Sequence, residues 1–433
     1  RGATHCDRGP PPGSPRRPAA TVRAVSIAAP APARSSGLGG MGPFLFAAAA
    51  MFTVMYSTQA ILPQLGRAFH VSPAQTGLTV SLAVGALALG AWFWGPLSDR
   101  IGRRASLVLS SALLVVPSLG LALAPSFGVL LAMRALQGLC MPGLLTVGVP
   151  YVTEAFGARI GARAMGLYVS SLVLGGLVGR VGVALLTSLV GWRPALAAVA
   201  ALPLAATLVM RRRLPPEPQA PRSAGLSAGT LLGLLRNRTL VGATLAGSAL
   251  FFAFMGAFSY IDFRLERPPF SLPPAVIGLV FLLWLMGAVG PHAGRLVDRH
   301  GWRRVALGGL FACAGGLTLS LAPVLPLVVI GLALVTLGNF TAVVAAQLGV
   351  ASATDTDRGL ASSVYFSAYY LAGALGGYVP GLAWESWRWV GVWALDMVAY
   401  AVGLVAIVAA AVASVRRPEA LSRRPAPAAP RRD

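Results

Sequence analysis

An acidic residue followed by several arginines forms the first motif in the sequence that could do chemistry. The motif comes directly after a long apolar stretch and reads Gly95-Pro-Leu-Ser-Asp99-Arg100-Ile-Gly102-Arg103-Arg104. A carboxylate at a helix boundary is stabilised by the positive end of the helix dipole, and arginines pair with acids or with lipid phosphates. The motif therefore predicts an ion-pair latch that can form and break. Simple retention of positive charge on one side of a membrane is the alternative interpretation.

A degenerate copy of this motif shows that the chain repeats itself. The copy reads Gly294-Arg-Leu-Val-Asp298-Arg299-His-Gly301-Trp302-Arg303, and Asp298 follows Asp99 by 199 residues. Two shorter echoes pair Tyr168-Val-Ser170 with Tyr365-Phe-Ser367, and Gly191-Trp192-Arg193 with Ser386-Trp387-Arg388. Motifs that recur at a nearly constant separation along the chain indicate two parallel copies of one structural unit. We expect the latch function of Asp99 to extend to Asp298 and Arg299.

Two arginines lie inside apolar runs of spanning length. A charged side chain at the centre of a bilayer costs about 2.5–3.5 kcal/mol, so neither Arg134 nor Arg180 should face lipid. Arg134 is expected to line a central cavity or to pair with Gln59 and Gln137. For Arg180, a substrate or coupling role and a structural hydrogen bond to a helix carbonyl both remain open.

Acidic residues are scarce in the apolar runs. Asp396 lies eight residues into the last run, where it either carries a coupling proton or pairs with a polar neighbour. Asp262 stands two residues before Arg264 and is expected to be an exposed charge at the rim. Two buried cations without a buried acid in the first half favour an anionic or carboxylate-bearing substrate.

Aromatic side chains in the second half could form the apolar walls of the same cavity. The candidates are Trp284, Tyr365, Tyr369 and Tyr370. Apolar walls with a few polar groups are typical of small-molecule sites. Ordinary helix packing is the alternative role of these rings.

Composition excludes several classes of chemistry. Hydrophobic residues make up 56% of the 433 residues and charged residues 11%, and all 35 basic residues are arginine. Without lysine there is no Walker A lysine and no Schiff base. Gly225-Leu-Ser227-Ala-Gly229 matches G-x-S-x-G but lies in a Pro- and Arg-bearing segment, not between a strand and a helix. The three cysteines lie far apart and suggest no metal site. We expect no enzyme activity and no cofactor.

Twelve apolar runs are long enough to cross a bilayer as helices, which takes about 20 residues each. They cover residues 43–63, 74–98, 104–124, 126–152, 161–190, 193–210, 239–264, 273–296, 303–322, 325–350, 359–384 and 388–414. The predicted units are a six-helix half over 41–211, a cytoplasmic linker over 212–238 and a second half over 239–415. Residues 1–40 and 416–433 are rich in Pro, Ala and Arg and predict disordered tails. The first tail is either native or upstream of a start at Met41.

The distribution of arginine predicts the orientation in the membrane. With both termini in the cytoplasm, all but seven of the 35 arginines fall on the cytoplasmic side, as the positive-inside rule requires. The exceptions are Arg134 and Arg180 within spans and Arg67, Arg193, Arg264, Arg267 and Arg388 outside. The net charge of +22 is then a topology signal and an attraction to lipid headgroups, not a nucleic-acid surface.

These motifs resemble the major facilitator superfamily, whose loop between helices two and three reads G-x-x-x-D-R-x-G-R-R. Arg134-Ala-Leu-Gln137-Gly138 resembles the R-x-x-Q-G motif of its twelve-helix drug:proton antiporter branch. Gly166, Gly175, Gly179 and Gly182 have the spacing of the antiporter motif, with Arg180 in place of the family's proline. Tyr56-Ser-Thr-Gln59-Ala-Ile-Leu-Pro63 adds a likeness to YnfM-type and arabinose-efflux-like inner-membrane transport proteins.

The resemblance implies an all-α membrane protein of twelve helices in two pseudo-symmetric halves. It implies that Asp99 bridges to the cytoplasmic end of helix eleven, with Glu154 as an arginine partner. The implied activity is proton-coupled efflux of a small organic molecule by alternating access at the bacterial inner membrane. A proton or substrate gradient would drive this transport, and a monomer would carry it out. Uptake, uniport or exchange of a small metabolite is the alternative, and a receptor or scaffold without transport is an alternative of another class. The substrate or coupling candidates are Tyr56, Gln59, Arg134, Gln137, Arg180, Trp284, Tyr365, Tyr369 and Asp396.

Overall fold

The computed structural model describes residue 2 and residues 38–215, 228–354 and 358–415, without the side chains of 38–39, 153–163, 228–231, 288–291, 358 and 413–415. All the helices described below belong to one compact unit, Ser35–Asp433. The described residues contain no strand. The predicted tails, apart from residues 2 and 38–40, and residues 216–227 of the predicted linker lie outside this part of the chain.

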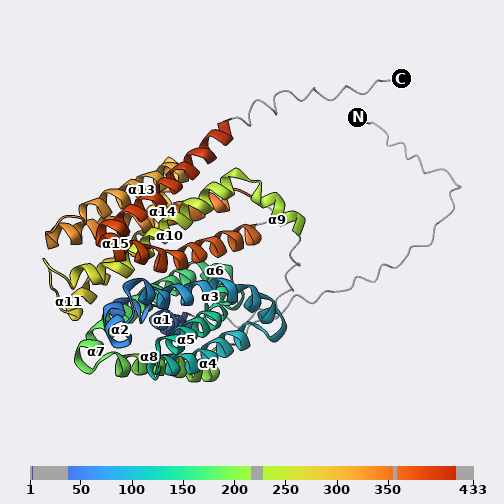
Figure 1. The fold of residues 1–433 in the computed structure, drawn as a ribbon. Coiled ribbons are helices and arrows are strands. Elements are labelled where there is room, and N and C mark those ends of the chain that lie inside the picture. Colours follow the sequence, from blue (N-terminus) through green and yellow to red (C-terminus); the bar gives the residue numbers. More distant parts are fainter. Residues whose placement is uncertain (1, 3–37, 216–227, 355–357, 416–433) are drawn as a thin grey trace. The chain divides into compact units, whose positions relative to one another are not determined.

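The first half is a helical bundle, coloured blue to green in Figure 1. Its elements are η1 (Leu38–Met41), α1 (Gly42–Tyr56), η2 (Gln59–Ile61), α2 (Leu62–Phe69), α3 (Pro73–Ile101), α4 (Arg103–Ala122), α5 (Phe127–Cys140), α6 (Pro142–Leu177), the π-helical turn η3 (Val178–Gly182), α7 (Val183–Val190) and α8 (Trp192–Arg213).

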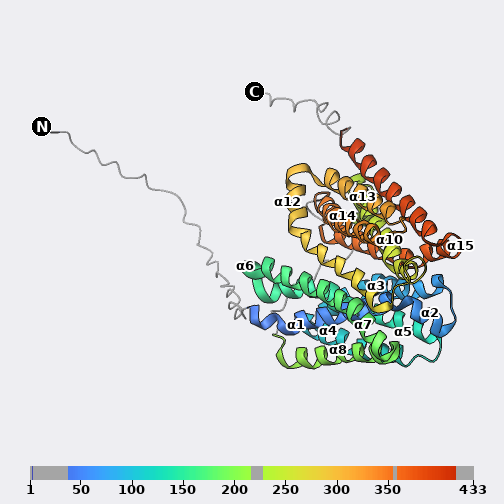
Figure 2. The same ribbon diagram turned by 90° about the vertical axis from the view of Figure 1, so that its left-hand side faces the viewer.

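The second half forms another bundle, coloured yellow-green to red, and Figure 2 shows both from the side. Its elements are α9 (Ala228–Leu235), α10 (Arg238–Leu265), α11 (Pro274–Leu279), η4 (Val280–Val289), α12 (Gly290–His300), α13 (Trp302–Leu319), α14 (Leu325–Ala351) and α15 (Arg358–Val415). The short helix α9 lies within the predicted linker.

The helices confirm the predicted fold class. Within the described residues, nine helices are long and apolar enough to cross a membrane, or ten with a bent pair, Pro274–Gly287 and His292–His300, counted as one span. The long α15 contains a kink at Arg388, with φ 53° and ψ −137°, and covers the eleventh and twelfth predicted spans. The ninth predicted span is α13, which has 18 residues. Each predicted span thus corresponds to a helical segment.

Local sequence explains where several spans begin. Ser72 accepts a hydrogen bond from the backbone N–H of Gln75, whose side chain in turn accepts one from the Ser72 backbone N–H, so α3 starts with a complete capping box. Ser126 and Asn237 cap α5 and α10 in the same manner through their side-chain oxygens. These caps fix the helix ends that the apolar pattern alone leaves uncertain.

The first span is broken between α1 and α2. Pro63 lacks a backbone N–H, so the carbonyl of Gln59 cannot receive its helical hydrogen bond across this turn. The break leaves the last carbonyls of α1 in the interior and turns the buried Gln59 side chain into the bundle. Both features position the site described below.

The halves touch near the helix ends around the 70–72 and 266–273 connections. Within the second half, the hydroxyl of Tyr260 on α10 donates to the carbonyl of Gly377 on α15, at 2.8 Å, and both groups face Gly77 of the first half. Arg67 and Glu266 form an ion pair of 2.5 Å between α2 and the end of α10. A side chain at Gly77 of α3 would collide with the Gly377 carbonyl, so these two glycines permit the close approach of the halves.

Candidate functional site

Arg180 forms the centre of a cluster between the two halves. Its side chain is fully buried and lies in η3, where the π-helical turn interrupts the fifth span. The guanidinium carbon lies 3.6 Å from the ring centre of Tyr56 and 3.5 Å from that of Trp284. Cation–π contacts of this kind contribute about 2 kcal/mol when desolvated. Because Tyr56 belongs to the first half and Trp284 to the second, Arg180 links the halves.

Hydrogen bonds satisfy only part of this guanidinium. Its Nε donates to Gln59 Oε1 at 2.8 Å, and Nη1 donates to the Gly176 carbonyl at 2.9 Å. Gln59 Nε2 then donates to Ser259 Oγ on α10, at 3.2 Å, which crosses to the other half. Nη2 is buried and has no acceptor among the described residues. An unsatisfied charged donor is costly, so this nitrogen is a place for a ligand oxygen.

Asp262 completes the cluster and corrects the prediction of an exposed rim charge. Its side chain is 1% exposed, and neither carboxylate oxygen has a hydrogen-bond partner among the described residues. It follows Ser259 by three residues, so both lie on one face of α10, and its charge interacts with that of Arg180. The prediction was wrong because it counted residues to the helix end, whereas α10 is enclosed by α14, α15 and elements of the first half.

Arg134 has different surroundings, and its hydrogen bonds to the described residues all stay within the first half. Its Nε donates to the Thr79 carbonyl at 2.6 Å, Nη1 to the Val54 carbonyl at 3.1 Å and Nη2 to the Met55 carbonyl at 2.7 Å. Nη1 also donates to Gln137 Oε1, at 2.8 Å. The bond to Gln137 was predicted, but Gln59 pairs with Arg180 instead. Arg134 therefore stabilises the broken end of α1, whose carbonyls carry the negative end of the helix dipole.

The aromatic candidates separate into two groups. Trp284 lies in the cluster, with ring centres 4.7 Å from Phe254 and 5.6 Å from Tyr56. Tyr369 stacks on Phe251 at 4.1 Å, and Tyr365 lies 5.6 Å from Tyr369. The second group packs α15 against α10. Of the predicted rings in the second half, Trp284 contacts Arg180 directly.

Asp396 is also fully buried, but inside the second half. Its oxygens have no hydrogen-bond partner among the described residues. A side chain at Gly256 would lie 2.8 Å from Asp396 Oδ1 and 2.9 Å from Pro380, which places the carboxylate where α10 meets both parts of α15. Its coupling role stays a prediction.

The predicted latch is built around an ion pair within its own loop. Asp99 Oδ1 pairs with Arg103 Nη1 at 2.7 Å, and Arg103 also donates to Ser98 Oγ. Arg104 donates to the carbonyls of Arg211 and Leu214 at the end of α8, both at 2.9 Å. A bond from Asp99 to the end of helix eleven stays a prediction.

The other latch candidates occupy simpler places. Arg100, Asp298 and Arg299 are exposed, and Gly95 lies within α3. Gly102, with φ 92°, connects α3 to α4, and Gly301, with φ 79°, connects α12 to α13, so the two copies share one hinge geometry. Glu154 belongs to the stretch whose side chains are not described.

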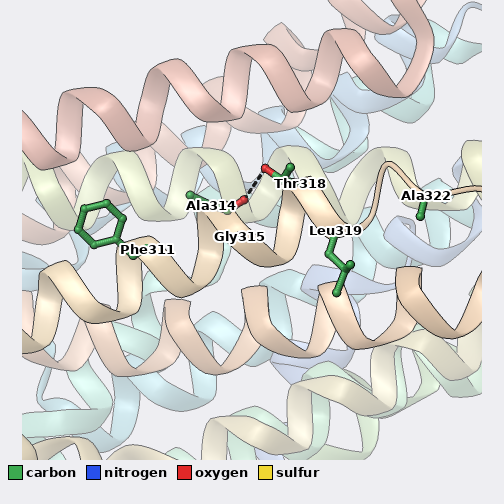
Figure 3. Close-up of a pocket in the computed structure, with 6 residues that line it drawn as sticks. All are labelled: Phe311, Ala314, Gly315, Thr318, Leu319 and Ala322. Carbon is green, nitrogen blue, oxygen red and sulfur yellow. Dashed lines mark hydrogen bonds between the residues drawn. The ribbon is translucent and has the colours of Figure 1, made fainter.

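A surface groove of about 670 Å³ lies elsewhere, on α13. Figure 3 shows its lining residues, Phe311, Ala314, Gly315, Thr318, Leu319 and Ala322. The Thr318 hydroxyl donates to the Ala314 carbonyl at 2.8 Å, so its hydrogen is already used. All six residues come from one helix and the turn after it. The groove carries no charged lining residue and is separate from the cluster around Arg180.

A bundle of membrane-spanning helices in two repeated halves, with buried charges where they meet, defines the class of secondary transporters. The sequence profile described as Major Facilitator Superfamily matches residues 44–290 and 267–432. The chain belongs to this superfamily. It is therefore a multi-pass membrane transporter and not an enzyme.

Known relatives agree with this assignment. The chain is 34% identical over 361 residues to the inner membrane transport protein YnfM of Escherichia coli (strain K12), covering 82% of this chain and 86% of YnfM. It is 30% identical over 345 residues to the uncharacterized MFS-type transporter YybF of Bacillus subtilis (strain 168), covering 79% of this chain and 85% of YybF. A crystal structure of the nucleoside transporter NupG, solved as a point mutant, has a similar fold, with a TM-score of 0.70 at 16% identity, covering 85% of this chain and 98% of NupG.

Proposed function

We propose that the protein exports a small organic molecule across the bacterial inner membrane in exchange for protons, by alternating access and with both termini in the cytoplasm. The observation that carries this proposal is Asp262, a buried carboxylate without a hydrogen-bond partner among the described residues, whose charge interacts with that of Arg180 of the other half. Export is supported by the resemblance of Arg134-Ala-Leu-Gln137-Gly138 to the antiporter-branch motif. One chain contains both halves and works as a monomer, and the proton gradient replaces any cofactor.

The proton acts through the attraction between Asp262 and Arg180. The ionised carboxylate attracts the guanidinium of the other half. This attraction stabilises the closed arrangement, in which the two halves touch at this cluster. A protonated, neutral Asp262 loses this attraction, so the closed arrangement becomes less stable. Protonation and opening are thereby linked, because the proton binds one arrangement better than the other.

The charge of the substrate then decides the direction of proton movement. A neutral or cationic molecule that contacts ionised Asp262 competes with the proton, which gives exchange. An anion that contacts Arg180 binds better when Asp262 is protonated, which gives movement of both in the same direction. Export driven by proton entry therefore requires a neutral or cationic substrate at this site.

Uptake of a carboxylate together with a proton is the second candidate. The observation in its favour is Nη2 of Arg180, which is buried without an acceptor among the described residues. A substrate carboxylate would supply the missing oxygen in a charge-assisted hydrogen bond.

Proteoliposomes containing the full chain and an internal pH dye test both candidates. Anionic, neutral and cationic small organic molecules are added in turn, and substrate and proton movements are recorded. We expect exchange with a neutral or cationic compound, and Asp262→Asn should abolish the compound-dependent pH change. Asp396→Asn is the matched control, because it removes another fully buried carboxylate of the second half.

Each alternative has its own result. Co-movement of protons with an anion would replace exchange by uptake, and substrate movement without proton flux would indicate uniport or exchange of metabolites. Binding of a compound without any movement would indicate a receptor. Loss of the pH change in Asp396→Asn but not in Asp262→Asn would move the proton site to Asp396.

A further inference from the structure

A cationic pocket lies at the ends of the second-half helices, apart from the cluster around Arg180. The pocket has a volume of about 260 Å³, and its lining includes Arg264, Arg267 and Arg388. Trp384, Trp389 and Phe270 supply aromatic walls. The three arginines come from the end of α10, the connection to α11 and the kink in α15, so the fold brings together charges that are far apart in the sequence.

The concentration of arginine here runs against the topology of the chain. With both termini in the cytoplasm, as proposed above, only five arginines lie on the outer side, and three of them line this pocket. Arginine is disfavoured on the outer side of short loops. Three such residues around one small pocket indicate a function for their charge.

The arginines of the pocket form no ion pair with a protein carboxylate in the described part of the chain. Among the described residues, no ion pair within 4 Å joins Arg264, Arg267 or Arg388 to an acid, and the nearby Glu266 pairs with Arg67. Arg264 uses Nη2 to bind the carbonyls of Leu321 and Ala322, at 3.0 and 2.9 Å, which fixes its orientation.

Two buried donors of the lining also lack partners in the described part of the chain. They are Nε of Arg264 and Nε1 of Trp384, a side chain that is 1% exposed. Buried donors normally find acceptors, so an absent ligand with acceptor oxygens would explain them. Nε1 of Trp389, in contrast, donates to Ser320 Oγ at 3.1 Å.

The lining and the size of the pocket define the ligand. Arginine forks match the oxygens of phosphate, and indole and phenyl rings contact an apolar or methylene body. A volume of about 260 Å³ is below the usual range for drug-sized ligands, so it suits a headgroup-sized anion. Trp387, beside Arg388, is 68% exposed, and exposed tryptophan is typical of the headgroup level of a membrane.

We propose that this pocket binds a phosphate group carried by a small organic body. The phosphate is supplied either by an anionic phospholipid of the outer leaflet or by a soluble phosphate ester. The site is independent of the transport reaction proposed above.

Native mass spectrometry of the full chain in detergent tests the proposal with dihexanoyl phosphatidylglycerol, glycerol 1-phosphate and zwitterionic dihexanoyl phosphatidylcholine. We expect an anionic probe to bind, and the double variant Arg267→Gln/Arg388→Gln to raise its Kd at least about tenfold, since charge-assisted bonds are lost. Both side chains are exposed, so the fold should persist, and thermal unfolding checks this. Arg193→Gln is the matched control, because Arg193 is an outer arginine whose guanidinium carbon lies 4.4 Å from the Trp192 ring centre.

The result separates the sources of phosphate and can overturn the proposal. Preference for phosphatidylglycerol over the choline lipid supports a lipid site, and binding of glycerol 1-phosphate at similar affinity supports a soluble ester. No binding of either anionic probe, or equal binding by the double variant and the wild-type chain, overturns the proposal. Equal loss in Arg193→Gln also overturns it, because the effect would then reflect overall charge.

Discussion

Arg134 and Arg180 are both fully buried in the first half, but the protein treats their charges differently. All three nitrogens of Arg134 donate to backbone carbonyls within one half. Arg180 keeps a buried donor without an acceptor among the described residues and contacts the other half through Trp284. The first arrangement maintains a structure, whereas the second leaves binding capacity for a ligand.

This difference predicts that the same substitution, arginine to glutamine, lowers stability more at Arg134 than at Arg180. Arg134→Gln leaves buried carbonyls of α1 and α3 without a donor, each costing about 1–3 kcal/mol, so we expect a loss of about 3 kcal/mol or more. Arg180→Gln removes one cation–π cluster of about 2 kcal/mol but also removes an unsatisfied buried charge, so stability should change less.

Thermal unfolding of both variants in the same detergent measures this difference. Transport per folded molecule should survive better in Arg134→Gln than in Arg180→Gln. A larger drop in Tm for Arg180→Gln would contradict the structural role assigned to Arg134.

At this scale the sequence predicted which residues matter better than it predicted their partners. The cost of burying charge identified Arg134 and Arg180 without a structure. Their partners depend on the break after Tyr56 and on the packing of α10, neither of which follows from local pattern. Asp262 was misplaced for the same reason, although the spacing of Ser259 and Asp262 on one helix face was a usable signal.

The glycines of the repeated loop motif have different roles at the scale of helices. Gly102 and Gly301 adopt φ 92° and 79° with ψ near the extended value, a region open only to glycine. Gly95 and Gly294 lie within helices, and a side chain added there would meet no atom within 4 Å. The first glycine of each motif is thus replaceable and the second is not.

We expect Gly102→Ala and Gly301→Ala each to destabilise the protein by about 1–3 kcal/mol through backbone strain. Gly95→Ala and Gly294→Ala are the matched controls and should stabilise it by up to about 1 kcal/mol, because alanine favours helix. Unfolding in one detergent compares all four variants. Equal effects of the two substitutions within one motif, Gly95→Ala and Gly102→Ala or Gly294→Ala and Gly301→Ala, would show that the positive φ does not limit the substitution.

Most elements were predictable because apolar runs report spans directly. The twelve predicted runs correspond to helical segments, and the repeat indicated two halves. Three features were not predictable from periodicity: the π-helical turn at 178–182, helix α9 in the linker, and the continuous helix α6, which runs from the fourth predicted span into the fifth. Each depends on tertiary contacts or on a local choice between helix types.

At the scale of the whole molecule, the described parts of the two halves meet in three places: the buried cluster around Arg180, the small residues of α3 and α15, and an exposed ion pair. An exposed ion pair such as Arg67–Glu266 contributes about 1 kcal/mol at most, so the close approach of α3 and α15 must supply more of the closure. Alternating access requires this contact to open.

Enlarging Gly77 should open this contact. In a cysteine-free chain carrying Arg67→Cys and Glu266→Cys, a short thiol cross-linker should join the halves efficiently. Gly77→Leu should remove most of this cross-linking, because its side chain would collide with Gly377 and Tyr260. Gly95→Leu on the same helix is the control and should leave it intact. Undiminished cross-linking in Gly77→Leu would show that α3 and α15 do not determine closure.

The π-helical turn that holds Arg180 also matters for how relatives are compared. A π turn contains one residue more than an α turn, and one residue rotates the following helix by about 100°. In a relative with a regular α turn there, the positions after Gly182 would face another direction, including Ala184, which packs tightly against Gly278. An alignment across residues 178–182 therefore needs a one-residue gap wherever the turn is absent, or it pairs residues that point about 100° apart around the helix axis.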